Sequence, residues 1–283
     1  NITGETYIAG DDSAMFINAA TTKADITGNL TSYSKNGNAA KLTNGALLDV
    51  SENANFISDG TPNNDGSSNA LVIEGNGTFN GKNYQAVVGE NLTAISKDNT
   101  AISLSNGASL HVGGNEIIYG ENGLVIDSSQ HNVTGDLIGR ADNIAVNVMG
   151  KNSNLTVGGN ILVEGGNIGV TVENNTITVN GGDGTGANVV KSNSGNALKA
   201  FESTVTLNAG ANGANSIVSG EIFSVKGVYY TGTAINATSA SNGAENNRTG
   251  GSEIYVLGSE NFIGGTVRAN GVESIVNIGG SVD

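Results

Sequence analysis

Cysteine is absent from this chain of 283 residues, and proline occurs once, at Pro62. Without cysteine, a disulfide framework, thiol catalysis and a cysteine metal site are all excluded. The 43 glycines do not indicate collagen or disorder, because no strict triplet repeat occurs. Hydrophobic residues also make up 37% of the chain, and many are placed with a period of two. This composition favours a folded β protein.

Long apolar runs and positive charge are also scarce. No segment is apolar enough to cross a bilayer, and the first residues, NITGETYIAG, lack the basic and apolar parts of a signal peptide. We therefore expect a mature or excised soluble part of a protein. Only 12 basic residues stand against 26 acidic ones, a formal net charge of −14. Because such a surface repels phosphates, neither nucleic acid nor anionic lipid is expected as a partner.

A short phrase, asparagine or glycine followed by small and branched apolar residues, recurs along the chain. It reads NAAKL at 38–42, NALVI at 69–73, NTAISL at 99–104, NGLVI at 122–126, NIAVNV at 143–148, NIGVTV at 167–172 and NALKA at 196–200. The leading asparagines are 31, 30, 23, 21, 24 and 29 residues apart. This spacing predicts a stack of coils and not a closed globule.

Two further apolar phrases recur within the intervals. The second reads ASLHVGG at 108–114, SNLTVGG at 153–159, NTITVNGG at 175–182, STVTLNAG at 203–210 and SEIYVLG at 252–258. Its apolar residues are two apart, as in a strand with one buried face. The third reads NEIIYGENG at 115–123, NILVEGGN at 160–167, ANVVKSN at 187–193 and NSIVSGE at 215–221.

Three short strands per coil, separated by Gly or Asn corners, predict an all-β fold, a right-handed parallel β-helix. We expect one solenoid domain over residues 1–283, with about eleven coils and a length of about 50 Å. Stacked coils should align Leu104, Ile126, Val148 and Val172 in one inward ladder, and Val146 should also face inward. Asparagine suits the corners because it tolerates positive φ and its side chains can hydrogen-bond along the stack.

The irregular coil length, the corners and phrases such as SNLTVGGNI at 153–161 and NGALLDVSENANF at 44–56 resemble the passenger region of type V bacterial autotransporters. The resemblance implies a secreted β-helix on the bacterial cell surface, anchored to the outer membrane. That family's signal segment and C-terminal membrane barrel are missing here, so membrane contact is expected only through such a missing barrel. The last residues, NIGGSVD, stop in mid-pattern, and we expect an excised part of a longer passenger.

Residues for catalysis or metal binding do not converge in the sequence. The Gly-His-Gly turn and Arg-Ile-Lys segment of β-helical polysaccharide hydrolases are absent, as is a GDSGS-type protease turn. Asp11 and Asp12 are interpreted as a polar corner, Ser194 as a loop residue without a base, His111 as pointing out to solvent and His131 as an exposed corner residue. GGDGTG at 181–186 and TPNNDG at 61–66 lack the remaining ligands of calcium loops. We expect no enzyme activity, no metal and no cofactor.

Four polar stretches, at 59–69, 181–196, 208–215 and 239–251, are the first candidates for recognition, because loops on a rigid scaffold commonly bind ligands. Each is equally an inert insertion. The candidate binding residues within them are Asn63, Asn64, Asp65, Asp183, Asn246 and Asn247. Tyr229 and Tyr230 are consecutive, so in a strand one must face out, either to stack on a sugar or as an exposed tyrosine without a partner.

These features predict an adhesin that binds by its sides or loops and performs no catalysis. One mechanism is self-association between copies on neighbouring cells, through many Asn, Ser, Thr and Asp hydrogen bonds, leading to aggregation or biofilm. The other is attachment to a glycan or protein of a host or bacterial surface. A polysaccharide-degrading β-helix enzyme and a passive stalk are the alternatives from other functional classes.

Overall fold

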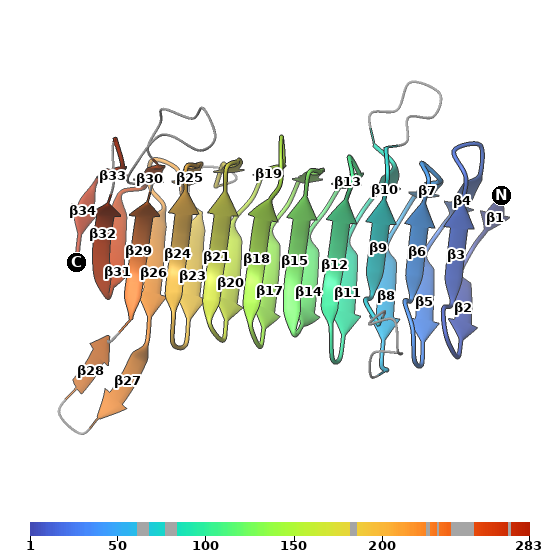
Figure 1. Ribbon diagram of the computed structural model, residues 1–283, viewed down its shortest axis with the longest axis horizontal. Coiled ribbons are helices and arrows are strands. Elements are labelled where there is room, and N and C mark those ends of the chain that lie inside the picture. Colours follow the sequence, from blue (N-terminus) through green and yellow to red (C-terminus); the bar gives the residue numbers. More distant parts are fainter. Residues whose placement is uncertain are drawn as a thin grey trace.

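The computed structural model is a solenoid of parallel β-strands, and the residues that it describes form no helix (Figure 1). It describes residues 1–60, 68–76, 84–181, 186–224, 227–230, 232–238, 252–270 and 273–283, with the side chains of 221–229 excepted. Each coil contributes one strand to each of three parallel sheets, which we name A, B and C. The prediction of a parallel β-helix with three strands per coil is confirmed, with about ten turns.

The strands of sheet A are β1 (Ile2–Thr3), β4 (Lys23–Thr27), β7 (Leu47–Val50), β10 (Ala86–Val88), β13 (Ser109–Val112), β16 (Gln130–Val133), β19 (Asn154–Val157), β22 (Thr176–Val179), β25 (Thr204–Asn208), β30 (Glu253–Leu257) and β33 (Ile275–Ile278). The strands of sheet B are β2 (Thr6–Gly10), β5 (Leu30–Ser34), β8 (Ala54–Ser58), β11 (Leu92–Ser96), β14 (Glu116–Gly120), β17 (Leu137–Ala141), β20 (Ile161–Gly165), β23 (Ala187–Ser192), β26 (Ala214–Ser219), β31 (Glu260–Gly264) and β34 (Ser281–Val282). The strands of sheet C are β3 (Met15–Asn18), β6 (Ala40–Thr43), β9 (Leu71–Glu74), β12 (Thr100–Ser105), β15 (Asn122–Asp127), β18 (Ile144–Met149), β21 (Ile168–Glu173), β24 (Asn196–Phe201), β29 (Thr233–Thr238) and β32 (Thr266–Asn270).

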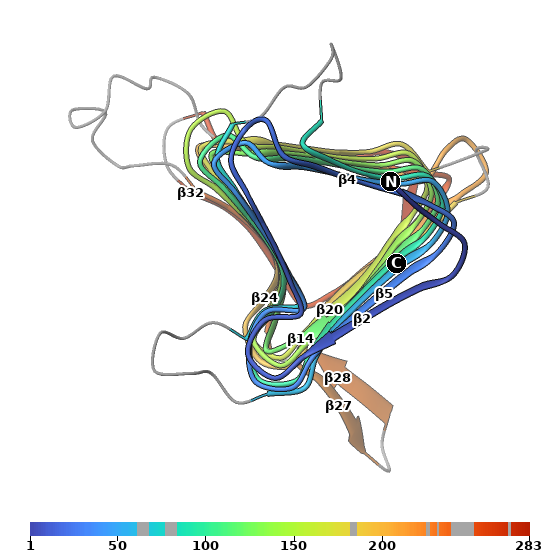
Figure 2. The ribbon, with the colours of Figure 1, turned by 90° about the vertical axis from the view of Figure 1, so that its right-hand side faces the viewer.

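The three recurring phrases correspond to the three sheets. The first phrase forms strands of sheet C, the second strands of sheet A and the third strands of sheet B. Figure 2, seen from the N-terminal end, shows a triangular cross-section in which the chain runs clockwise from sheet A to B to C as it recedes. The solenoid is therefore right-handed, the usual hand for a connection between parallel strands.

The core is a set of apolar ladders inside the triangle. Leu104, Ile126, Val148 and Val172 are successive partners in sheet C and are fully buried, as predicted from the repeats. Val146 is also fully buried, between Leu124 and Val170 of the adjacent coils. Because strand side chains alternate between two faces, one correct position fixes the inward and outward residues of the whole strand.

Small residues at the entrance to sheet C explain why Ala or Gly recurs in the first phrase. Ala101, Ala145 and Ala197 are fully buried there. In the coil between the first two, the position belongs to Gly123, where an added Cβ would lie 2.3 Å from the carbonyl oxygen of Ala145. Such a distance is far shorter than van der Waals contact, so the tight corner accepts only the smallest residues.

Asparagine stacks hold the corner that precedes sheet B. The Nδ2 of Asn53 donates to Oδ1 of Asn29 at 3.0 Å, and the Nδ2 of Asn91 donates to Oδ1 of Asn53 at 2.9 Å. The backbone N–H of Asn115 then donates to Oδ1 of Asn91 at 2.9 Å. At another corner, Asn106 adopts a positive φ of 59°, which asparagine tolerates better than most residues. The predicted corner role of asparagine is confirmed at these positions.

One hairpin departs from the solenoid. Strands β27 (Glu221–Ser224) and β28 (Gly227–Tyr230) pair in antiparallel fashion between β26 of sheet B and β29 of sheet C. Figures 1 and 2 show that this hairpin projects away from the stacked coils. The two consecutive tyrosines therefore belong to the end of a protruding strand and not to a coil.

Candidate binding surface

The outer face of sheet B carries apolar side chains across six neighbouring strands. In one outward row Ile57, Ile95 and Tyr119 are register partners on β8, β11 and β14. In the other, Ile117, Ile138, Leu162 and Val189 are partners on β14, β17, β20 and β23. We call these seven residues the apolar stripe. The two rows are continuous because Ile117 and Tyr119 lie on the same face of β14.

These side chains point outward because their chain neighbours fill the core. Glu116 and Ile118 are fully buried, whereas Ile117 between them is half-buried and Tyr119 is 44% exposed. Six strands about 4.8 Å apart and two rows about 10 Å wide outline a rectangle of about 300 Å², and the stripe occupies seven of its twelve outward positions. Contiguous apolar patches, unlike single exposed hydrophobic residues, are often functional.

The outer face of sheet A is different in composition. The corresponding outward row there contains Asn132, Thr156, Thr178 and Thr206, which are partners on four successive strands. The two sheets share the same inward ladders of Leu, Ile and Val, so the fold does not require apolar residues on its outside. The stripe is therefore a property of one face and not of the solenoid in general.

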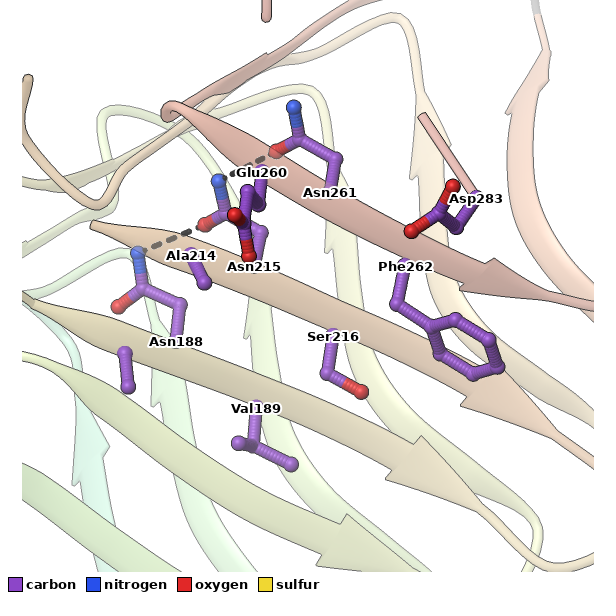
Figure 3. Close-up of a pocket in the computed structure, with 10 residues that line it drawn as sticks. Asn188, Val189, Ala214, Asn215, Ser216, Glu260, Asn261, Phe262 and Asp283 are labelled. Atoms are coloured by element: carbon purple, nitrogen blue, oxygen red, sulfur yellow. Dashed lines mark hydrogen bonds between the residues drawn. The ribbon is translucent and has the colours of Figure 1, made fainter. Parts of the chain in front are cut away.

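A shallow hollow extends the same face toward the C-terminal end (Figure 3). It has a volume of about 180 Å³, and its lining includes Val189, Ser216, Glu260 and Phe262. Beneath the hollow, buried asparagines form a chain of hydrogen bonds, from Asn188 to Asn215 at 2.9 Å and from Asn215 to Asn261 at 2.8 Å. Because every amide in this chain has a partner, the floor of the hollow is held in one conformation.

Tyr230 contacts this extended face through its ring. It meets Phe262 edge to face, with ring centroids 5.6 Å apart, and is partly buried. Tyr229 pairs with Ile222 within the hairpin, and its side chain lies outside the described residues. Asn63, Asn64, Asp65, Asp183, Asn246 and Asn247 lie outside them as well, so their predicted roles stay predictions.

Two of the four polar stretches differ from the expectation of long interruptions. Residues 187–192, within the stretch 181–196, form strand β23. The stretch 208–215 reduces to a corner between β25, which ends at Asn208, and β26, which begins at Ala214. The physical reason is the same in both cases, because each stretch contributes an apolar residue to the core, Val190 in the first and Ala209 in the second, and both are fully buried.

His131 is buried, and the prediction that it lies in an exposed corner is wrong. Its column in sheet A contains Leu110 and Leu155 on the adjacent coils, so its side chain points into the core. There its Nε2 lies 2.7 Å from Oε2 of Glu116, and its Nδ1 lies 3.1 Å from the carbonyl oxygen of Leu110. Both side chains of the ion pair have 0% exposure.

Burial lowers the pKa of His131, but the charge and hydrogen bond of Glu116, with the carbonyl of Leu110, outweigh burial, and its pKa is raised. The remaining oxygen of Glu116, Oε1, has no hydrogen-bond partner. A carboxylate and an imidazole in contact are groups that can exchange a proton. Here neither can meet a substrate, because both side chains are sealed inside the coil.

The other polar residues considered for chemistry lie apart from one another. His111 points outward as predicted, but it is half-buried and its ring stacks on Tyr84 at 4.9 Å. Asp11 and Asp12 lie exposed in the corner between β2 and β3, and the hydroxyl of Ser194 donates to the carbonyl oxygen of Gly166 at 3.0 Å in another corner. Within the described residues, no three His, Asp or Glu side chains gather as metal ligands do.

Comparison with known proteins assigns no family to the chain. No protein-family model matches it, and neither a curated protein nor a solved structure does. The described residues also include no helix that is long and apolar enough to cross a membrane. What the chain does must therefore be inferred from its own fold and surface.

Proposed function

We propose that the chain is an adhesin of autotransporter type, displayed on a bacterial cell surface, that makes contact through the outer face of sheet B. The observation that carries this proposal is the apolar stripe. Ile138 and Leu162 are only partly buried where they lie, so each keeps an apolar side open to water. An apolar row that the core does not need is best explained by a partner that covers it.

The architecture supports a role in adhesion in a second way. A solenoid of about ten parallel coils is a stiff rod, because each coil is hydrogen-bonded to the next along three sheets. A rod presents a long flat side on which many weak contacts act together. The irregular coils, the absence of cysteine and the acidic surface agree with secretion to the cell exterior, the route that the autotransporter resemblance implies.

The function we propose is non-catalytic. The His131–Glu116 pair is the one place within the described residues where a histidine and a carboxylate meet, and it is enclosed by the core. Substrate would need to enter between stacked coils to reach it. This enclosure favours an adhesin over a polysaccharide-degrading enzyme.

The test is adhesion by cells that display the chain. Ile138→Asn with Leu162→Asn places two polar residues in the stripe, and Thr156→Asn with Thr178→Asn is the matched control on the outer face of sheet A. Clumping, or attachment to a second cell type, should be largely lost with the stripe variant and kept with the control. Equal adhesion by both variants would contradict the proposal and favour a passive stalk.

A further inference from the structure

Charge on the outer face of sheet B does not follow the acidity of the whole chain. The formal net charge is −14. In the two outward rows from β5 to β26, however, the charged residues are Arg140, Glu164 and Lys191, two cations and one anion. They lie on three successive strands in one row. Two acidic rods would repel each other along most of their surface, but this face lacks that repulsion.

The pair formed by Arg140 and Glu164 is complementary to itself when its order is reversed. A symmetric dimer that packs face to face has its two-fold axis in the plane between the faces. If that axis runs parallel to the strands, the order of coils is reversed in the second copy, while each outward row stays opposite itself. The row of Arg140 and Glu164 would then read in opposite directions in the two copies.

We propose that the outer face of sheet B binds a second copy of this chain with the rods antiparallel, the two-fold axis passing between β17 and β20. Arg140 then faces the partner's Glu164, and by symmetry the same pair forms a second time. In the other row, Ile138 faces the partner's Leu162 and Ile117 faces the partner's Val189. This inference rests on the proposed function, since it names the partner of the same face.

Three alternative registers are less favourable. An axis between β20 and β23 would pair Glu164 with the partner's Lys191, but it would place Arg140 opposite the partner's buried Val218. An axis through β20 would place Arg140 opposite the partner's Lys191, two like charges. An axis through β14 would place Arg140 opposite the partner's Ile95, so that a charge would be buried against an apolar side chain. The axis between β17 and β20 avoids facing like charges, and it places Lys191 opposite the partner's Tyr119, whose aromatic ring can accept a cation. This register also pairs accessible side chains, because the Arg140 side chain is 65% exposed and the Glu164 side chain is 36% exposed. Within one chain, Nε of Arg140 lies 4.0 Å from Oε1 of Glu164.

The area available in this register suits a weak interface that acts in many copies. Six strands, from β11 to β26, overlap on the flat part of the face, because Tyr230 of the hairpin packs against Phe262 on β31. They give a length of about 29 Å at about 4.8 Å per strand, and strands of about five residues make the face about 16 Å wide, so each copy contributes about 460 Å². The total of about 900 Å² is typical of a weak interface. Many copies on two cells would strengthen it through multivalency.

The test uses two charge-reversal variants of the whole chain, Arg140→Glu and Glu164→Arg, in sedimentation experiments. Each variant alone sets like charges against each other at both symmetric contacts, so its dimer dissociation constant should rise by at least roughly tenfold. A mixture of the two variants recreates opposite charges at both contacts and should dimerise within about threefold of the unmodified chain. Lys199→Glu, an outward charge reversal on sheet C, is the control and should leave dimerisation unchanged.

Recovery of dimers in the mixture cannot come from an ion pair restored within one chain. In either variant, positions 140 and 164 carry like charges in the same molecule, so only contacts between molecules can restore association. Dimers that are indifferent to both variants, or a mixture that stays monomeric, would overturn the proposed register. An unmodified chain that stays monomeric while cell adhesion still depends on Ile138 and Leu162 would overturn the second copy as partner and leave the proposed function standing. If dimerisation responds to the charge reversals as expected but adhesion does not depend on Ile138 and Leu162, the proposed function would be overturned and the second copy would remain the partner of this face.

Discussion

Replacing Glu116 and His131 with leucine, singly and together, tests how the buried ion pair contributes to stability. Leucine occupies the same columns on adjacent coils, as Leu92 and Leu137 beside Glu116 and as Leu110 and Leu155 beside His131. The double variant therefore continues two existing apolar ladders. Each single variant instead leaves one polar group in the core without its partner.

The expected magnitudes follow from desolvation. Removing one member of a buried ion pair costs about 3 to 5 kcal/mol, because the other remains buried and uncompensated. Replacing both by apolar residues of similar volume is neutral or stabilising, by about 1 to 4 kcal/mol. We expect the double replacement to be stabilising here, because it removes Oε1 of Glu116, a buried oxygen without a hydrogen-bond partner.

Urea unfolding at pH 7, followed by circular dichroism, measures these differences. With a slope of about 3 kcal/mol per molar urea, each single variant should lower the midpoint by about 1 to 1.7 M. The double variant should unfold at or above the midpoint of the unmodified chain. A double variant as unstable as either single one would refute the reasoning. It would mean that the intact ion pair stabilises the fold by itself, and that the loss in the single variants does not come from leaving one buried group unpaired.

Two further outcomes follow from the core. Val146→Ala should lower the free energy of unfolding by about 1 to 3 kcal/mol, and Val146→Asp by more, because a fully buried position receives a cavity or an unpaired carboxylate; an unchanged melting temperature for Val146→Asp would contradict its inward position. Because the pKa of His131 is raised in the folded state, its protonation adds to the free energy of unfolding. This contribution is complete at pH values below the ordinary pKa of 6.5 and is lost as the pH rises through the higher pKa of the folded state. The urea midpoint of the unmodified chain should therefore fall between pH 6 and pH 9 more than that of the Glu116→Leu, His131→Leu double variant, and equal falls would exclude the linkage.

The coils could be predicted from the sequence because inward positions repeat. Leu104, Ile126 and Val148 recur in the same phrase, and stacking places like positions directly above one another. That regularity also fixed the pleat at Val146. The loops could not be predicted in the same way, because residues between strands follow no period that would identify a ligand.

The buried pair could not be predicted from neighbours along the chain. His131 lies between Gln130 and Asn132, a polar setting that is typical of a corner. Its neighbours in space are instead the residues one coil before and one coil after. When successive strands are aligned by their apolar residues, His131 falls in the same column as Leu110, and Glu116 falls in the same column as Leu137.

The apolar stripe was present in the sequence as a difference between phrases. On β16, β19, β22 and β25 of sheet A the residue between two inward positions is polar, as Thr156 is between Leu155 and Val157. On β14, β17, β20 and β23 of sheet B it is apolar, as Leu162 is between Ile161 and Val163. Both strands fill the same core, so folding accepts threonine at the middle position. An apolar middle residue repeated from coil to coil thus reports on the outside of the solenoid. This pattern shifts the expected contact surface from the polar sides and loops to one strip of isoleucine, leucine, valine and tyrosine, where substitution should affect association before it affects the fold.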